Sequence, residues 1–283
     1  MSEHDVIGQD RVAVVTGAAS GIGRSLAESL ASKGSAVVVA DLDGFSAETV
    51  AHGIEAAGGT ALAVKVDVSN AASVDKLAST TLDRFGRVDI LCNNAGVSTF
   101  NLVKDQTLND WRWVVDVNFW GVVHGIHTFL PIMKDQGTPA HIVNTSSIGG
   151  LLSGVPFIGP YCATKAAVVS ISETLAQELV MDGSPIKVSV LCPSSTNTQV
   201  MESERGRPTS LGVERRTEVS ESVRLAIKEG FTGPEGQTPA QVAARVLEAI
   251  GAGEFWIITH SGERPMVENR VAGMLAAFPT VEG

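Results

Sequence analysis

Short runs of β-branched and apolar residues alternate with longer segments of helical period along most of the chain, and this alternation constrains the fold more than any other feature. The runs are almost continuously apolar, as expected for parallel strands covered by helices on both faces. Between them, apolar side chains recur at helical spacing, as Ile22, Leu26 and Leu30 do before Gly34. The pattern predicts an α/β protein with a doubly wound sheet of about seven parallel strands. We expect the strands at residues 11–16, 35–41, 60–68, 88–94, 140–147, 186–193 and 254–259.

No Pro/Gly/Ser-rich linker interrupts the alternation, so we expect a single domain over residues 1–283 with its core at about 11–259. Residues 194–238 break the pattern, because they are polar and follow directly after a predicted strand. Ligands bind at the carboxyl ends of strands in open α/β sheets. We therefore expect a mobile flap over a site, with a passive surface insertion as the alternative. The tail 260–283 is expected to form one short helix that closes a site of its own or of a neighbouring subunit.

The charge and the apolar segments exclude several classes of partner. The net charge is −10, and no cluster of Lys and Arg is present, so we expect no nucleic-acid partner. The most apolar long segment, 114–133, contains acidic, amide and histidine side chains, which a bilayer tolerates poorly. The first ten residues, "MSEHDVIGQD", lack the basic start and apolar run of a secretory signal. The sequence predicts a soluble cytoplasmic protein with no membrane partner.

Cysteine and histidine show no metal-binding pattern. Cys92, Cys162 and Cys192 are far apart and lie beside apolar or small residues, so we expect free thiols in a reducing compartment. His124 and His127 share a helix face but have no carboxylate or cysteine pattern nearby. We expect packing or surface roles for them and no metal site.

A glycine-rich stretch, "VTGAASGIG" (15–23), follows the first predicted strand and opens the first helix. Its glycines are Gly17, Gly21 and Gly23. Missing side chains permit a tight turn and a close approach of the backbone to a pyrophosphate at the positive end of a helix. In this context the stretch predicts a dinucleotide-binding loop, although an ordinary turn would have similar glycines.

Asp41 ends the second predicted strand, 18 residues after Gly23. A carboxylate at this place accepts hydrogen bonds from the adenosine ribose hydroxyls and repels a 2′-phosphate. No basic residue occupies Ser20 or Leu42 to offset the repulsion, so NAD is favoured over NADP. A turn or cap role for Asp41, and help from Arg24 in accepting NADP, are the alternatives.

The stretch "VDVSN" places two further residues at the end of the third predicted strand. Asp67 and Val68 lie where the edge of an adenine ring would lie. Asp67 is equally suited to a turn. We expect both residues to border the adenosine end of the site.

Tyr161, the only tyrosine, stands four residues before Lys165 at the start of a predicted helix, in "GPYCATKAAVVSISETLAQEL". Residues four apart on a helix are neighbours, so the ammonium can approach the phenol. A positive charge there favours the phenolate and lowers a pKa that begins at about 10. The pair therefore predicts general acid/base chemistry, with an ordinary packing tyrosine as the alternative.

Five motifs occur in one order along this α/β pattern: "TGAASGIG" (16–23), "NNAG" (93–96), Asn118, "NTSS" (144–147) and "YCATK" (161–165). With them the sequence resembles the short-chain dehydrogenase/reductase family in its single-domain form, from about Arg11 to Thr259. The resemblance implies a Rossmann-type oxidoreductase that uses a nicotinamide cofactor.

The resemblance also implies roles for individual residues. Tyr161 would take the alcohol proton while hydride leaves the same carbon, Lys165 would assist it and bind the nicotinamide ribose, Ser147 would position the substrate oxygen, and Asn118 would support a proton-relay water. Position and resemblance together give the expected cofactor-binding set: Gly17, Ser20, Gly21, Ile22, Gly23, Asp41, Asp67, Val68, Asn94, Ala95, Gly96, Tyr161, Lys165, Pro193, Thr196 and Thr198.

Two features depart from the family pattern. Ser147 stands 14 residues before Tyr161, one more than usual, so the loop between them carries an insertion. Ser194 follows Pro193 where the family has glycine, which puts the local turn in question.

The candidate walls of the substrate site are 98–102, 151–158 and the 194–238 segment. They are rich in apolar side chains, which favours a hydrophobic or aromatic secondary alcohol and its ketone; these are Leu151, Leu152, Val155, Phe157 and Met201. The family resemblance also implies a homodimer or homotetramer. The alternatives are a catalytically silent NAD-binding regulator on the same fold, and an epimerase or dehydratase that uses NAD transiently.

Overall fold

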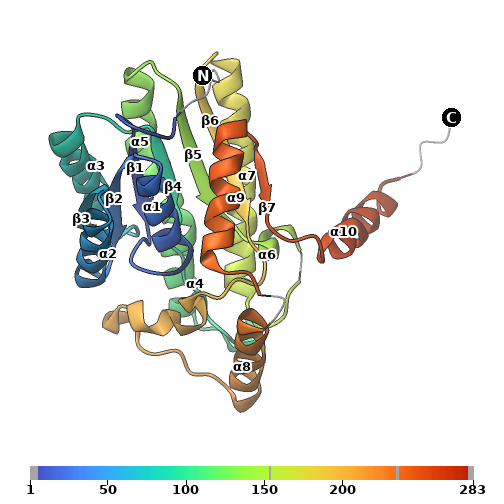
Figure 1. The fold of residues 1–283 in the computed structure, drawn as a ribbon. Coiled ribbons are helices and arrows are strands. Elements are labelled where there is room, and N and C mark those ends of the chain that lie inside the picture. Colours follow the sequence, from blue (N-terminus) through green and yellow to red (C-terminus); the bar gives the residue numbers. More distant parts are fainter. Residues whose placement is uncertain (1–5, 153, 234–235, 280–283) are drawn as a thin grey trace.

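The protein is described here by a computed structural model, which covers residues 6–152, 154–233 and 236–279. Its centre is a seven-stranded sheet in the order β3-β2-β1-β4-β5-β6-β7, with every neighbouring pair parallel (Figure 1). Each strand lies within the range predicted for it, which confirms the doubly wound parallel sheet. The strands are β1 (Val12–Thr16), β2 (Ala36–Asp41), β3 (Thr60–Lys65), β4 (Ile90–Asn93), β5 (Ala140–Thr145), β6 (Ile186–Cys192) and β7 (Trp256–Ile258).

Helices cover both faces of the sheet because successive side chains of a strand point to opposite faces. In β1, Ala13 and Val15 pack into one apolar core, and Val14 packs into the other. The first core is closed by α1 (Gly21–Ser32), α2 (Gly44–Ala56) and α9 (Pro239–Ala252). The second is closed by α3 (Ala71–Phe85), α5 (Gly121–Asp135) and α7 (Gly159–Met181).

The strand order places a crevice at the carboxyl ends of β1 and β4. The chain runs from β1 outward to β3 and then returns to the other side of β1 with β4. The connections after β1 and β4 therefore leave toward opposite sides, which is the position where ligands bind in such sheets. Three further helices lie at this end of the sheet, in the lower half of Figure 1: α4 (Leu108–Val115), α6 (Ile148–Leu151) and α8 (Glu218–Thr232).

The apolar segment 108–135 folds as α4, a π-helical turn η2 (Asp116–Trp120) and α5. Within the described ranges, no helix has the length and apolar character needed to cross a bilayer.

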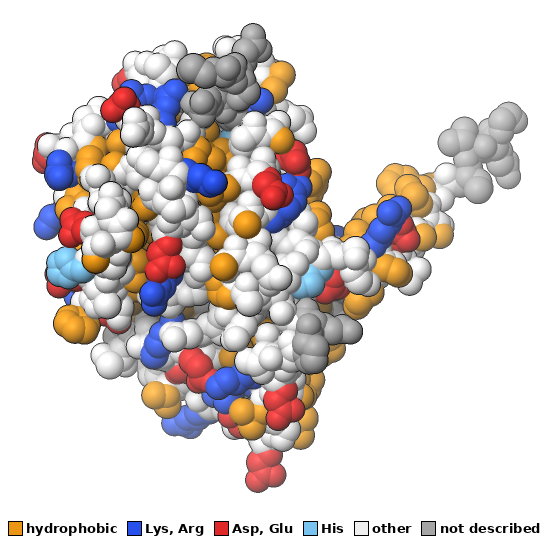
Figure 2. All heavy atoms as spheres, viewed as in Figure 1, with side chains coloured by type: hydrophobic (Ala, Val, Ile, Leu, Met, Phe, Trp, Pro, Cys, Tyr) orange, Lys and Arg blue, Asp and Glu red, His pale blue; other side chains and the backbone are white. Residues whose placement is uncertain are grey.

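The expected tail helix is α10 (Arg264–Ala276). It projects away from the rest of the molecule, and none of its residues is buried (Figures 1 and 2). Figure 2 also shows acidic and basic side chains interspersed over the visible face of the molecule. The helix therefore keeps contact with the body near its start and through Arg270, which donates to the Leu151 carbonyl at 2.7 Å, while most of its residues are exposed.

Candidate active site

A cavity of about 760 Å³ lies at the carboxyl ends of the strands. Its lining includes every residue expected in the catalytic and cofactor-binding sets except Gly23 and Asn118. The residues brought together come from the ends of β1 through β6 and from the start of α7. The topology thus gathers residues that are up to 181 positions apart in the chain, from Gly17 to Thr198.

The glycine loop needs its missing side chains for close packing. Gly17 has φ of +66°, and a Cβ there would lie 2.8 Å from Ala95 Cα. A Cβ on Gly23 would lie 2.2 Å from the Gly17 carbonyl oxygen, so a side chain at this position would prevent the loop from packing. Gly23 does not line the cavity. The loop then enters α1 at Gly21, where the first backbone N–H groups of a helix favour an anion.

The "NNAG" turn joins the ends of β4 and β1. The Asn94 and Ala95 N–H groups both donate to Thr16 Oγ1, at 3.0 and 3.2 Å, and Asn94 Nδ2 donates to the Thr16 carbonyl at 3.0 Å. A Cβ on Gly96 would lie 3.4 Å from Lys165 Nζ. The turn therefore holds the loop in place and also brings Gly96 close to Lys165.

Asp41 lines the cavity and also caps the local backbone. Its Oδ2 accepts from the Ala19 N–H and its Oδ1 from the Asp43 N–H, each at 2.9 Å. The two sequence interpretations of Asp41 are therefore compatible. Asp67 behaves similarly: it lines the cavity, and its Oδ1 accepts from the Ser69 N–H at 3.0 Å and the Ser69 hydroxyl at 2.6 Å.

Sequence reasoning missed a cation at this end of the cavity. Arg205 lines it beside Asp41, and its Nη2 lies 3.5 Å from Ser20 Oγ. Its other terminal nitrogen donates to the Gln199 carbonyl at 2.9 Å. Positions 20 and 42 carry no basic residue, but the 194–238 segment supplies one to the cavity, Arg205. The charge near Asp41 therefore cannot be judged from positions 20 and 42 alone.

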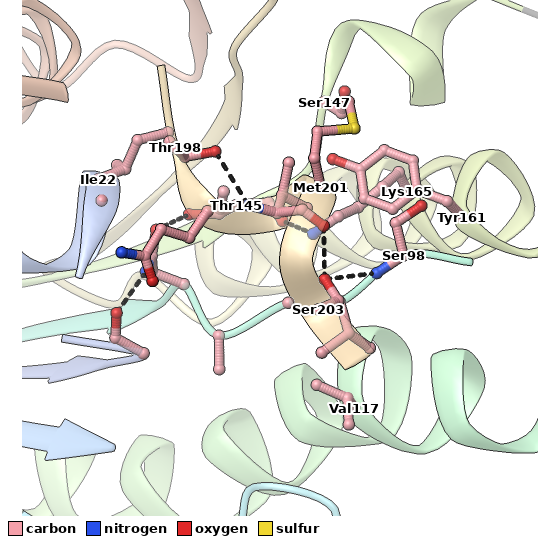
Figure 3. A pocket seen from close by; sticks show the side chains of 18 of the residues that line it. Ile22, Ser98, Val117, Thr145, Ser147, Tyr161, Lys165, Thr198, Met201 and Ser203 are labelled. Carbon is pink, nitrogen blue, oxygen red and sulfur yellow. Dashed lines mark hydrogen bonds between the residues drawn. The ribbon is translucent and has the colours of Figure 1, made fainter. Parts of the chain in front are cut away.

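At the other end of the cavity, Lys165 and Tyr161 lie on successive turns of α7 (Figure 3). Lys165 is buried, its Nζ donates to the Thr145 carbonyl at 2.7 Å, and it stands 5.6 Å from the centroid of the Tyr161 ring. Burial lowers the pKa of Lys165 to about 8. The Lys165 ammonium therefore faces the Thr145 carbonyl.

The expected lowering of the Tyr161 pKa is not found in this structure. Burial raises the pKa of Tyr161 to about 12, and a hydrogen bond with Ser147 opposes the rise only in part. The physical reason is that desolvation disfavours the phenolate. The Lys165 ammonium faces Thr145 and has itself a lowered pKa, so it gives little compensation.

The longer spacing between Ser147 and Tyr161 is absorbed by α6. Ser147 begins this helix and accepts from the Gly149 N–H at 3.1 Å. A Cβ on Gly149 would lie 3.3 Å from Cys162 Sγ and 3.7 Å from Tyr161 Cε1, so the short helix packs directly on the start of α7. Ser147 therefore reaches Tyr161 despite the insertion.

Asn118 lies in the π-helical turn η2 and is fully buried. Its Oδ1 accepts from the Val97 N–H at 2.8 Å, and its Nδ2 donates to the Val97 carbonyl at 2.9 Å and to Thr164 Oγ1 at 3.2 Å. The side chain anchors the segment after "NNAG" to α7. It does not line the cavity, so its part in a proton relay stays a prediction.

The walls beyond Ser147 and Tyr161 are mainly apolar. Leu152, Val155 and Met201 line the cavity as expected, whereas Leu151 and Phe157 lie outside its lining. Four further apolar residues line the cavity. Ile227 and Phe231 belong to the 194–238 segment expected as a wall, whereas Trp113 and Val117 lie outside the expected walls.

Most of the 194–238 segment is helical and lies over the cavity, as η3 (Gln199–Gly206), η4 (Thr209–Leu211) and α8. Its residues 234 and 235 lie outside the described ranges. Ser203 Oγ accepts from the Ser98 N–H at 3.1 Å (Figure 3), and Glu214 accepts from the Phe100 N–H. The segment is thus tied to the strand-end loop below it.

The two histidines for which we expected packing or surface roles are His124 and His127. His124 Nδ1 lies 2.8 Å from the Val68 carbonyl oxygen, and His127 is exposed. Among the described residues, no group of three His, Cys, Asp or Glu side chains is placed to hold a metal ion. Cys92 and Cys192 are buried free thiols, as expected, while Cys162 is half-buried.

These features define a dinucleotide-binding α/β protein with a buried lysine and a tyrosine in one cavity. The sequence profile described as short chain dehydrogenase matches residues 11–208. The chain belongs to the short-chain dehydrogenase/reductase family, whose members named below are dehydrogenases or reductases.

Three relatives illustrate the similarity. A short chain dehydrogenase/reductase from Burkholderia phymatum, solved in complex with NAD, has 40% identity and a TM-score of 0.91, with 98% of each chain covered. The CLA biosynthesis dehydrogenase/reductase of Lactiplantibacillus plantarum is 30% identical over 93% of this chain and 92% of its own. The C alpha-dehydrogenase of Sphingobium sp. strain SYK-6 is 31% identical over 97% of this chain and 88% of its own. An oxidoreductase with a nicotinamide cofactor follows.

Proposed function

We propose that the protein is an NAD-linked dehydrogenase that interconverts a hydrophobic or aromatic secondary alcohol and its ketone, with Tyr161 as general acid/base. One observation carries the proposal: a single cavity joins Asp41 and the glycine loop to Ser147 and Tyr161 and then to apolar walls. The NAD complex of the Burkholderia phymatum relative supports the choice of cofactor.

The residues of the cavity fit a dinucleotide. Gly17 and Gly23 leave no side chain where the loop is packed, and the start of α1 offers backbone N–H groups to a pyrophosphate. Asp41 would accept hydrogen bonds from the ribose hydroxyls, and Asp67 and Val68 line the same cavity. A bound nicotinamide ring supplies the hydride acceptor or donor.

The chain itself provides the proton transfer and the positioning. The Tyr161 hydroxyl would take the alcohol proton during oxidation and return it during reduction. Ser147, whose hydroxyl opposes the rise in the Tyr161 pKa, would hold the same substrate oxygen. The apolar walls and the segment over the cavity would exclude water, which strengthens the polar interactions inside. The high pKa of Tyr161 holds its proton ready for ketone reduction, whereas alcohol oxidation gains rate as the pH rises toward that pKa.

The test is reduced-nicotinamide absorbance from the purified chain with NAD or NADP and a panel of aliphatic, aryl and cyclic secondary alcohols. We expect turnover with NAD and a preference for hydrophobic or aryl alcohols. Turnover of small polar polyols alone would contradict the substrate class. NAD binding without turnover of any alcohol or ketone would favour the silent regulator, and substrate conversion without net reduced nicotinamide would favour the epimerase or dehydratase.

The cofactor preference has its own prediction, because Asp41 and Arg205 both line the cavity. Asp41→Asn removes the charge that repels a 2′-phosphate and leaves Arg205 able to attract it. We expect the ratio of NAD to NADP affinity, measured by calorimetry, to fall at least about tenfold. Adding Arg205→Ala to this variant should remove the gain in NADP affinity. An unchanged ratio in Asp41→Asn would contradict the role of this carboxylate.

The oligomer is also part of the proposal. The family resemblance supports a homodimer or homotetramer in the cytoplasm, and apolar side chains exposed at the end of α7, Val180 and Met181, are available for subunit contacts. Light scattering on the purified chain would measure the number of subunits.

A further inference from the structure

Glu263, at the start of α10, reaches back into the cavity from the tail. It is the N-cap residue of that helix and lines the cavity together with Ser194. Among described residues after Thr259, it alone belongs to the lining, because α10 then leaves the body. Among its described residues, the tail therefore presents a single carboxylate to the cavity.

The two oxygens of this carboxylate have different surroundings. Oε1 accepts a hydrogen bond from the Ser194 hydroxyl. Oε2 is inaccessible to solvent and has no hydrogen-bond partner among the described residues. A buried acceptor without a donor is unfavourable, and more so when it is charged. The site is thus short of one donor at this point.

The cations nearest in sequence do not supply that donor. Arg264 pairs with Glu268 at 2.7 Å, and Arg270 donates to the Leu151 carbonyl at 2.7 Å. His260, three residues earlier, has a buried Nε2 that also lacks a partner among the described residues, and its Nδ1 lies 2.8 Å from Thr259 Oγ1. Apart from the Ser194 hydroxyl, no described side chain therefore hydrogen-bonds the Glu263 carboxylate, which lines the cavity.

A chain of contacts connects the Glu263 carboxylate to the part of the cavity where Ser147 lies. Ser194, which holds Glu263, follows Pro193, and the Pro193 carbonyl accepts from the Ile148 N–H at 2.9 Å and lies 3.5 Å from Ser147 Oγ. The serine that departs from the family pattern is thus the residue that links the tail to the neighbourhood of Ser147. A glycine at position 194 would have no hydroxyl to hold the carboxylate.

We propose that Glu263 is a specificity-determining residue, whose carboxylate accepts a hydrogen bond from a hydroxyl or ammonium group that the substrate carries beside its reacting carbinol. The substrate class becomes an apolar or aromatic secondary alcohol with a second hydrogen-bond donor. This inference rests on the proposed dehydrogenase function. Ser194 is a positioning residue, because it acts on the substrate only through Glu263.

The test uses three aryl secondary alcohols whose carbinol carbon bears a methyl, a hydroxymethyl or an aminomethyl group. For the native chain, kcat/KM with NAD should be at least about tenfold higher for a donor-bearing alcohol than for the methyl alcohol. Glu263→Leu should abolish this preference and leave turnover of the methyl alcohol intact. Glu263→Gln keeps an acceptor without the charge, so it should spare a hydroxyl substrate and fail with an ammonium substrate. Ser194→Gly should reduce the preference, whereas Glu268→Gln, one helical turn further on, should not.

Two results would overturn the inference. One is an equal kcat/KM for the three alcohols in the native chain. The other is a Glu263→Leu variant that changes only the calorimetric affinity for NAD, since the carboxylate would then serve the cofactor. If the native chain turns over none of them, the proposed function fails separately. Calorimetry then measures the affinity of the same alcohols for the NAD-loaded native chain and for NAD-loaded Glu263→Leu. Equal affinities of the two chains for the donor-bearing alcohols would contradict the inference.

Discussion

Tyr161→Phe is expected to lower turnover by a factor of about 10²–10⁴, the usual contribution of a positioned general acid/base. The change removes only the hydroxyl and keeps the ring, which packs against α6. Calorimetric affinity for NAD should stay within a few-fold of native, because the loss is confined to proton transfer. The measurement is kcat with the best alcohol of the panel and with its ketone.

The control for this variant is Cys162→Ala, at the adjoining position of α7. Cys162 is half-buried and lies outside the lining of the cavity, so its removal should leave kcat near native. A Tyr161→Phe protein that keeps more than about a tenth of native kcat would contradict the acid/base role, since the expected loss is at least about a hundredfold.

Arg207→Met is expected to lower the free energy of unfolding by about 3–5 kcal/mol, because it leaves a buried carboxylate without its partner. Arg207 Nη2 lies 2.6 Å from Asp110 Oδ1, with side chains 3% and 2% exposed. The guanidinium also lies 5.1 Å from the centroid of the Trp113 ring, which lines the cavity. The same change should therefore loosen the segment over the site and raise KM more than it lowers kcat.

Urea unfolding of the native chain and the variant measures the first effect. The matched control is Lys134→Met, which breaks the Lys134–Asp182 pair, also 2.6 Å long but with side chains 41% and 54% exposed. An exposed pair contributes less than about 1 kcal/mol. Equal losses in the two variants would show that burial of the Arg207–Asp110 pair adds nothing to stability.

The strands of the sheet were predictable because each is marked by a pattern of neighbouring residues in the sequence. Each strand is a short apolar run next to a helical segment, and β1 to β7 all fall within the predicted ranges. The site at the carboxyl ends of the strands follows from the same order, since parallel strands bring their ends to one edge. The glycine loop, Asp41, Ser147, Tyr161 and Lys165 were therefore found from sequence and line one cavity.

The features missed from sequence depend on contacts across the chain. Arg205 and Ser20 are 185 residues apart, and Glu263 and Ser194 are 69 apart, so no local pattern connects them. Trp113 and Val117 follow a helical period that is the same for a core face and a cavity face. The direction of the Tyr161 pKa was wrong for a related reason: helical spacing gives the neighbour at Lys165 but not the burial that outweighs it.

The acid/base role of Tyr161 can be measured directly, because the chain has one tyrosine and tyrosinate absorbance reports on that residue alone. The titration is made with and without NAD, with circular dichroism to monitor unfolding and Tyr161→Phe as the blank. Without NAD, burial should keep the phenol protonated up to at least pH 10, its pKa being about 12. With NAD, the positive charge of the nicotinamide in the same cavity should bring the transition down by at least about one unit. NAD that binds without moving the transition would contradict the account, because the tyrosine would then not be coupled to the cofactor.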